Sequence, residues 1–149
     1  MQIRRMTEND LGIITHLEQL LFEDPWQRKS FEFELNRNRY SICLVLEDKG
    51  RIIGYAIVWK IYEEFHIANF AIHPDFQGQK LGTYFLEQLL QYAGNARYAL
   101  LEVRESNLPA RHLYKKFGFK TIMKRHYYYR NGETALVMQK IFEKKKTGT

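Results

Sequence analysis

The spacing of apolar positions predicts short strands and helices along the whole chain. Residues 1–7 have the pattern of a first strand, and the apolar residues within 11–21 then recur every three or four positions, as on one face of a helix. A capping sequence at residues 7–10 precedes that helix. The dipeptide Asp24-Pro25 predicts a break, followed by a second short helix.

The middle of the chain predicts three successive strands. The first two are residues 40–46 and 51–60, and the acidic residues and glycine between them, at 47–50, are typical of a turn. Residues 61–72 are apolar without a clean period, which predicts one mostly buried strand. That strand is expected to end at His73-Pro74-Asp75.

The rest of the chain alternates between helix and strand. Residues 81–92 have helical spacing, and residues 98–106 are typical of a strand. Ser106-Asn107 predicts the cap of a further helix, with Pro109 in its first turn and Gly118 at its end.

Two final strands are expected to close the fold. Residues 120–129 and 133–142 flank Asn131-Gly132, a strong hairpin dipeptide. The whole order is strand, two helices, three strands, helix, strand, helix and two strands. That order predicts an α/β fold around a mixed sheet, with a ligand at the ends of the central strands.

Composition bounds the class of protein. A chain of 149 residues is about one domain, and 45% hydrophobic residues are enough for a real core. We expect one domain over residues 1–143 and a basic flexible tail at 144–149. No run approaches the roughly 18–20 apolar residues of a membrane span, and the first residues do not resemble a signal peptide. The single cysteine excludes a disulfide framework within the chain, which favours the reducing cytoplasm.

The charge balance is basic, but the excess is uneven. Lys and Arg number 23 against 17 Asp and Glu, a net charge of +6, and Lys144 to Lys146 supply three of the six. Recognition of nucleic acid needs a basic stripe on one face, which net charge alone does not provide. Direct nucleic-acid binding and membrane association are therefore not expected.

A polar loop at residues 73–82 separates a predicted strand from a predicted helix. Such a turn directs several backbone N–H groups outward, and the helix dipole adds about half a positive charge at the same place. The loop therefore favours a phosphate or pyrophosphate group.

This loop resembles the acetyl-CoA loop of the GNAT acetyltransferases, Gln/Arg-x-x-Gly-x-Gly/Ala. Residues 100–119, LLEVRESNLPARHLYKKFGF, resemble the strand and helix that complete the acyl-CoA site. Within the superfamily, Leu-Glu-Val-Arg-x-Ser-Asn and Ala-x-x-Leu-Tyr-x-x-x-Gly-Phe resemble the RimI type, bacterial enzymes that acetylate the N-terminal alanine of a small-subunit ribosomal protein. The resemblance implies a mixed, mostly antiparallel twisted sheet with helices on both faces. It extends over nearly the whole chain, including residues 24–26, 63–64, 69–72, 127–128 and 135–138.

Two positions depart from the family pattern. The first loop glycine of the family is Lys80 here, while a glycine stands two positions earlier, at Gly78. The Lys80 side chain can crowd a pyrophosphate, or its ammonium can contact a phosphate. Gln77, Leu81 and Gly82 still match, so a retained site is favoured. The second departure is Thr134, where the family often has an acidic residue.

Amide formation from a thioester needs a neutral amine, a polarised carbonyl and a protonated leaving thiol. An α-amine pKa of roughly 7.7–8.0 leaves an appreciable neutral fraction at cellular pH, so a base of moderate strength is sufficient. Glu102 is the candidate base, acting directly or through a water. Tyr114 is the candidate acid, because a phenol of pKa about 10 can protonate a thiolate of pKa about 8.5. The RimI resemblance implies the same two roles.

Both candidates have structural alternatives. Glu102 can be an outward-facing strand carboxylate paired with Arg104. Tyr114 can pack in the core with Leu113 and Phe117, which still allows its hydroxyl to face the site.

The resemblance implies acetyl-CoA as co-substrate, held mainly by backbone groups, and no metal. Residues 69–72 would lie along the pantetheine arm, and an N–H near Ile72 would polarise the thioester carbonyl. Residues 78–83 would hold the pyrophosphate, and Asn107 would bind the CoA arm or serve only as a helix cap. The implied cofactor-binding residues are Asn69, Phe70, Ala71, Ile72, Gln77, Gly78, Gln79, Lys80, Leu81, Gly82, Thr83 and Asn107.

The predicted substrate groove carries aromatic and acidic side chains. Carboxylates there suit a cationic peptide end. Residues 127–129 are three tyrosines that can instead pack as strand residues, and alternation along a strand prevents all three from lining one groove. The predicted substrate-binding residues are Trp26, Glu63, Glu64, Tyr127 and Tyr128.

Other reactive residue types receive no catalytic role. Residues 18–34 are acidic within a basic protein, but an ordinary solvated helix face is favoured for Glu32 and Glu34. Cys43 lies in mid-strand and is expected to be buried and inert. The five histidines show no metal spacing. His66 and His73 lie on or beside the site strand without an assigned role, and His112 is expected to face solvent.

Three functions remain open at this level. The first is an N-terminal protein acetyltransferase whose partner is a ribosomal protein. The second is an acetyltransferase for a small amine or a lysine side chain, whose pKa near 10.4 demands more help from a base. The third is a non-catalytic, ribosome- or RNA-associated basic module, suggested by Lys80 and the tail. Retention of both Glu102 and Tyr114 argues against the third.

Overall fold

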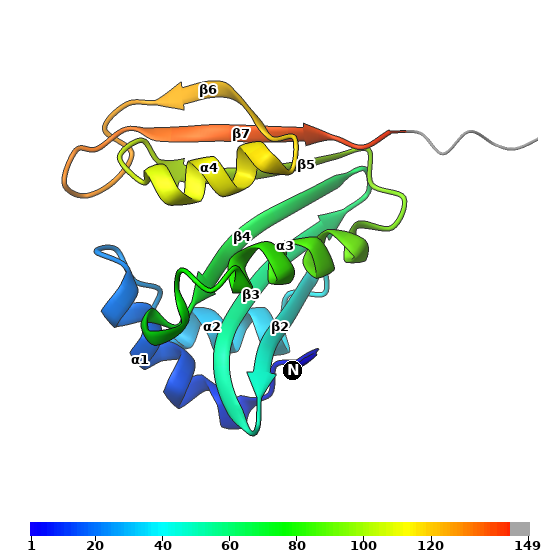
Figure 1. Cartoon of the computed structure of the whole chain (residues 1–149), viewed down its shortest axis with the longest axis vertical. Coiled ribbons are helices and arrows are strands. Elements are labelled where there is room, and N and C mark those ends of the chain that lie inside the picture. Colours follow the sequence, from blue (N-terminus) through cyan, green and yellow to red (C-terminus); the bar gives the residue numbers. More distant parts are fainter. Residues whose placement is uncertain (144–149) are drawn as a thin grey trace, which may run out of the picture. The chain divides into compact units, whose positions relative to one another are not determined.

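The computed structural model describes residues 1–143, so the predicted tail at 144–149 lies outside the described residues. Within the described part, the strands and helices follow the predicted order (Figure 1). Short 3-10 turns occur at Glu8–Asp10, Pro74–Phe76 and Gln91–Ala93. The main elements are β1 (Gln2–Arg5), α1 (Leu11–Leu21), α2 (Arg28–Asn36), β2 (Ser41–Asp48), β3 (Arg51–Ile61), β4 (Glu64–Ile72), α3 (Leu81–Leu90), β5 (Tyr98–Arg104), α4 (Leu108–Lys116), β6 (Lys120–Arg125) and β7 (Ala135–Ile141).

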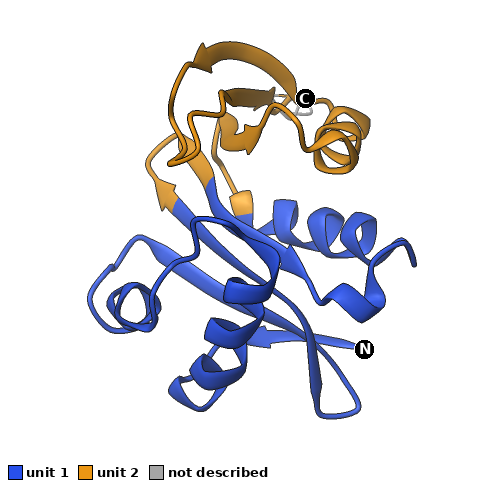
Figure 2. Ribbon diagram, turned by 90° about the vertical axis from the view of Figure 1, so that its left-hand side faces the viewer, with its two compact units in different colours: residues 1–59, 67–92 blue, residues 60–66, 93–149 orange. Residues whose placement is uncertain are grey.

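The chain divides into two compact units (Figure 2). Unit 1 comprises residues 1–59 and 67–92, and unit 2 comprises residues 60–66 and the described residues from 93 onward. Strand β4 begins in unit 2 and continues in unit 1. The prediction of a single domain over residues 1–143 stays a prediction.

Unit 1 is a sheet with helices on both faces. Its strands lie in the order β1-β2-β3-β4, and the β1–β2 and β2–β3 pairs are antiparallel. Helices α1 and α2 cover one face, where Phe31 packs edge-on against Tyr55 at a centroid distance of 6.1 Å. Helix α3 covers the other face. There Gly54 on β3 lies so close to Phe85 on α3 that a Cβ atom at Gly54 would come within 3.3 Å of the phenylalanine ring. These helices bury both faces of the central strands, as the long apolar runs predict.

Unit 2 contains an antiparallel sheet in the order β5-β7-β6. Glu102 on β5 pairs in register with Val137 on β7. Helix α4 begins after Asn107 and ends before Gly118, whose φ of +92° is the left-handed conformation that terminates many helices. The α/β class with mostly antiparallel strands is therefore confirmed. In the described part of the chain, no helix is both long enough and apolar enough to cross a membrane.

The predicted strand at 61–72 is wrong at its start. Strand β3 continues to Ile61, and the chain turns at Tyr62, which has a φ of +51°. Strand β4 then begins at Glu64, and its buried residues alternate strictly with less buried ones. The period of two was missed because Phe70 and Ile72, on the less buried face, are also apolar.

The predicted strand at 120–129 is too long. Strand β6 ends at Arg125, and Tyr127 has a left-handed φ of +57°. The Asn131-Gly132 turn is present, and the Gly132 N–H donates to the Tyr129 carbonyl at 2.8 Å. Because residues 127–129 are not in a strand, the alternation argument for the three tyrosines does not apply.

Candidate active site

Glu102 is held by an imidazole rather than by an arginine. It lies on β5, half-buried, and its Oε2 is 3.3 Å from Nε2 of His66 on β4. Arg104 instead pairs with Glu133 at 3.1 Å, so the alternative that pairs Glu102 with Arg104 is wrong. Alternation places residues 102 and 104 on the same face of β5, but their partners come from different elements.

The imidazole also sets the charge state of the carboxyl. The hydrogen bond with His66 holds the pKa of Glu102 below its ordinary value of 4.5, against the opposing effect of burial. The nearby charges of His66 and Arg125 act in the same direction as the hydrogen bond. Glu102 is therefore a carboxylate at neutral pH and can accept a proton.

The two predicted substrate carboxylates lie at the start of β4. Oε2 of Glu64 is 3.9 Å from Nδ1 of His66, so the imidazole lies between Glu64 and Glu102. Glu63 is in the preceding turn, and its exposed carboxylate pairs with Arg97 at 3.7 Å. Together with Ile61, Tyr62 and Tyr98, these carboxylates line a cavity of about 500 Å³.

Tyr114 is buried on α4. Its ring packs edge-on against Phe119 at a centroid distance of 5.7 Å. Packing with Leu113 and Phe117 stays a prediction. Burial raises the pKa of Tyr114 above its ordinary value of 10, so the phenol keeps its proton at neutral pH. A protonated hydroxyl is what a general acid requires.

The loop that joins β6 to β7 is held by Arg104. Its guanidinium stacks 3.9 Å from the ring centroid of Tyr129, and its partner Glu133 accepts a hydrogen bond from the Ser106 N–H at 2.9 Å. The predicted substrate residues Tyr127 and Tyr128 are exposed, with 86% and 47% of their surface accessible. They are therefore available for contact with a ligand.

The predicted pyrophosphate loop has a backbone suited to glycine at the position of Lys80. Lys80 has φ +61° and ψ +15°, the left-handed conformation, immediately before α3 begins at Leu81. The lysine thus adopts a backbone conformation that favours glycine, and its side chain is exposed. Nε2 of Gln77 donates to the Ile72 carbonyl at 3.1 Å, which ties the loop to the end of β4.

The other predicted loop residues surround this turn. Gly78 has a φ of +82° with open space around it, and Gln79 is exposed. Gly82 and Thr83 lie in the first turn of α3 and are half-buried. The backbone N–H groups of a first helical turn have no partner within the helix and can bind an anion.

A buried hydrogen-bonded network lies beneath the predicted pantetheine strand. Oε1 of Glu18 on α1 accepts from the Asn69 side chain and from the Tyr55 hydroxyl, each at 2.9 Å. Oε2 of Glu18 accepts from the backbone N–H of Trp26, also at 2.9 Å. This network joins the predicted residues Trp26 and Asn69 within unit 1. Glu18 has 2% of its surface exposed and was not predicted, although its place beside Leu17 on the apolar helix face was a signal.

The remaining predictions have mixed outcomes. Asn107 caps α4, and its Oδ1 accepts from the Ala110 N–H at 3.2 Å; contact with CoA stays a prediction. Cys43 is buried, as predicted, and burial raises the pKa of its thiol. His112 is exposed, as expected. Among residues 1–143, no cluster of three or more His, Cys, Asp or Glu side chains could hold a metal ion.

Comparison with known proteins identifies the class of this site. Residues 11–119 match the acetyltransferase (GNAT) family. The chain belongs to this family and is an N-acetyltransferase.

Individual relatives indicate the type of N-acetyltransferase within this family. The ribosomal protein bS18-alanine N-acetyltransferase of Escherichia coli (strain K12) is 33% identical over 129 residues, covering 85% of this chain and 86% of that protein. A Bacillus subtilis (strain 168) protein that carries the same name provisionally is 38% identical over 139 residues, covering 91% and 92%. The crystal structure of the ribosomal-protein-S18-alanine N-acetyltransferase from Escherichia coli superposes with a TM-score of 0.87 at 29% identity, over 99% of this chain and 98% of that one. The prediction of a RimI-type GNAT protein is thereby confirmed.

Proposed function

We propose that this N-acetyltransferase transfers the acetyl group of acetyl-CoA to the α-amine of an N-terminal alanine of a small-subunit ribosomal protein. The names of its relatives supply the class of substrate. The observation that carries the proposal is the half-buried Glu102 side chain, whose Oε2 lies 3.3 Å from Nε2 of His66 in a contact that lowers the pKa of the carboxyl. The cytoplasm, where ribosomal proteins are made, is the corresponding compartment.

The residues at the end of β4 and the start of α3 fit acetyl-CoA. Residues 77–83 offer the backbone N–H groups of a first helical turn, preceded by a left-handed residue that turns the chain before the helix. The exposed ammonium of Lys80 adds a positive charge for a phosphate. In this proposal residues 69–72 contact the pantetheine arm, and Asn107 contributes from the start of α4.

Acetyl-CoA supplies an acetyl thioester; the transfer forms a C–N bond to the amine and breaks the C–S bond. Glu102 takes a proton from the amine nitrogen, directly or through a water. His66 orients the carboxylate through the contact between its Nε2 and Oε2 of Glu102. Tyr114 gives its proton to the departing sulfur and regains one from solvent.

The charge state of Glu102 favours an α-amine over a lysine side chain. A carboxylate with a lowered pKa is a weak base, so it serves best when the amine is already partly neutral. An α-amine has a pKa of roughly 7.7–8.0, whereas a lysine amine near 10.4 is almost fully protonated at neutral pH. The alternative of a lysine or small-amine substrate is therefore less favoured. Membership of the N-acetyltransferase family argues against a non-catalytic basic module.

A direct test compares substrates that differ only in the acceptor. The release of free thiol from acetyl-CoA is measured with a peptide beginning Ala-Arg, with its N-terminally blocked twin, and with a polyamine. Turnover of the free peptide alone is expected. If the polyamine is acetylated and the peptide is not, the substrate is a small amine rather than a protein N-terminus. If the protein does not bind acetyl-CoA at all, the proposed enzymatic activity is wrong.

A further inference from the structure

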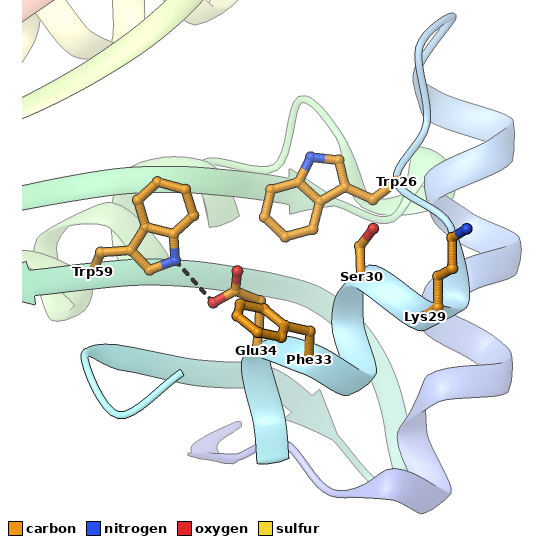
Figure 3. A pocket seen from close by; sticks show the side chains of 6 residues that line it. All are labelled: Trp26, Lys29, Ser30, Phe33, Glu34 and Trp59. Carbon is orange, nitrogen blue, oxygen red and sulfur yellow. Dashed lines mark hydrogen bonds between the residues drawn. The ribbon is translucent and has the colours of Figure 1, made fainter. Parts of the chain in front are cut away.

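The second cavity of interest is an aromatic pocket on unit 1, lined by Trp26, Lys29, Ser30, Phe33, Glu34 and Trp59 (Figure 3). Its volume is about 380 Å³, which accommodates one long side chain. We propose that this pocket binds the cationic side chain of an arginine or lysine in the N-terminal segment of the peptide substrate. The inference rests on the proposed function and specifies the substrate class further.

The pocket contains a buried carboxylate with one oxygen available. Glu34 has 7% of its surface exposed, so the prediction of a solvated helix face is wrong for this residue. Oε2 accepts from Nε1 of Trp59 and from the Asn38 amide, each at 2.9 Å. Within the part of the chain that the structure describes, Oε1 accepts no hydrogen bond, and Figure 3 shows it directed into the space between the two indole rings.

A buried carboxylate between aromatic faces is complementary to a cation. A guanidinium or ammonium placed there can donate a charge-assisted hydrogen bond to Oε1, because the Trp59 and Asn38 donors both bind Oε2. Indole faces attract the same cations through their quadrupole. The one cation that lines the pocket, Lys29, has its ammonium directed away from Glu34 in Figure 3.

The pocket is joined to the predicted acetyl-CoA strand within unit 1. The backbone N–H of Trp26 donates to Glu18, and the same carboxylate accepts from Asn69 at the start of residues 69–72. A peptide whose amine reaches that strand therefore has a cation-binding pocket anchored to the same network. Glu32, on the same helix, differs in being paired with Arg28 and in having 46% of its side chain exposed, which makes it the matched control.

Binding can be measured without catalysis, because the only two tryptophans of the chain, Trp26 and Trp59, both line the pocket. The probes are N-terminally acetylated alanine–glycine peptides with a single arginine at position 2, 3, 4 or 5, and the same peptides with uncharged citrulline. Tryptophan fluorescence is titrated for the wild type, Glu34→Gln and Glu32→Gln. Glutamine keeps an acceptor for Trp59 and removes the charge.

At one position, arginine should bind about tenfold more tightly than citrulline in the wild type and in Glu32→Gln. The ratio should fall close to one in Glu34→Gln. A ratio near one at every position in the wild type overturns the inference even if Glu34→Gln fails to fold. A ratio unchanged by a folded Glu34→Gln also overturns it.

The same peptides with free N-termini separate this inference from the proposed function. The ratio of kcat/KM values for arginine and citrulline should follow the binding ratio. Turnover of all peptides without an arginine preference leaves the proposed function standing and removes the pocket assignment. No turnover of any peptide, together with an arginine-dependent fluorescence change, removes the proposed function and leaves a cation site of another purpose.

Discussion

Nε2 of His66 lies 3.3 Å from Oε2 of Glu102, across residues that are 36 positions apart in the chain. The hydrogen bond is the largest cause of the lowered pKa of Glu102. A histidine without an assigned role in the sequence thus controls the charge of the candidate base. Its removal should alter the pH dependence of the enzyme more than its stability.

Replacement of His66 by Gln should shift the acidic limb of the kcat/KM profile to higher pH. A lowered pKa keeps Glu102 ionised into more acidic solution; without the imidazole, the carboxyl takes up a proton at a higher pH and the rate falls sooner on acidification. The measurement is kcat/KM against pH, with His112→Gln on the exposed face of α4 as control. If the acidic limb does not move, His66 does not influence the protonation of the catalytic base.

Replacement of Tyr114 by Phe should lower kcat by roughly 10²-fold or more, because the leaving sulfur loses its proton donor. The ring contact with Phe119 is retained, so the melting temperature should change little. Glu102→Gln should lower kcat by a similar factor while acetyl-CoA still binds. Single-turnover kinetics and calorimetric titration of acetyl-CoA provide the two readouts. A Tyr114→Phe variant with unchanged kcat would assign the tyrosine to the core alone.

Replacement of Lys80 by Gly should stabilise the fold and weaken the binding of acetyl-CoA. The left-handed backbone at Lys80 costs about 1 kcal/mol in a residue with a side chain, and glycine avoids that cost. Lys49, with φ +51° in the β2–β3 turn, is the matched control and should gain similar stability as Lys49→Gly. Only Lys80→Gly should raise the KM for acetyl-CoA, and most strongly at low salt, because a screened phosphate contact is lost. An unchanged KM would show that Lys80 does not contact the cofactor.

The Glu18 carboxyl should give unfolding a pH dependence of its own. Burial raises its pKa above the ordinary value of 4.5. A folded-state pKa above the unfolded one contributes stability at low pH, which is lost as pH rises through the folded value. The free-energy difference between wild type and Glu18→Gln should therefore shrink as pH rises above 4.5 and then level off.

Urea unfolding at a series of pH values measures this difference. Glu18→Gln should also cost about 1–3 kcal/mol, because one of the donors from Trp26, Tyr55 and Asn69 loses its acceptor. Glu32→Gln, at a half-exposed position, should show neither effect. A difference that does not vary with pH would mean that Glu18 titrates alike in the folded and unfolded chain.

Local features of the fold were predictable from sequence because their causes are local. The cap at Asn107, the helix end at Gly118 and the turn at Asn131-Gly132 each depend on a few consecutive residues. The errors also have local causes. Left-handed tyrosines interrupt two predicted strands, Tyr62 near the start of one and Tyr127 near the end of the other, and no glycine or proline stands there to indicate a turn.

The candidate site was predictable only in part. The resemblance provided Glu102, Tyr114 and the 77–83 loop, because motif residues are close together in the chain. The partners of these residues and the buried carboxylates were not predictable. In the sequence Glu34 looks like any exposed helical glutamate, and its burial and its hydrogen bonds with Trp59 and Asn38 distinguish it in the structure.

By itself, the sequence determined the order of elements, the family resemblance and the residue types available for chemistry. Periodicity, caps and turns act over short stretches, and a motif keeps its spacing whatever surrounds it. The tertiary structure alone decided which carboxylate is held by His66, which is buried with Asn69, and which faces an aromatic pocket. Those pairings join residues 25 to 51 positions apart, and they depend on strand register and helix packing, which bring distant polar groups out of water together.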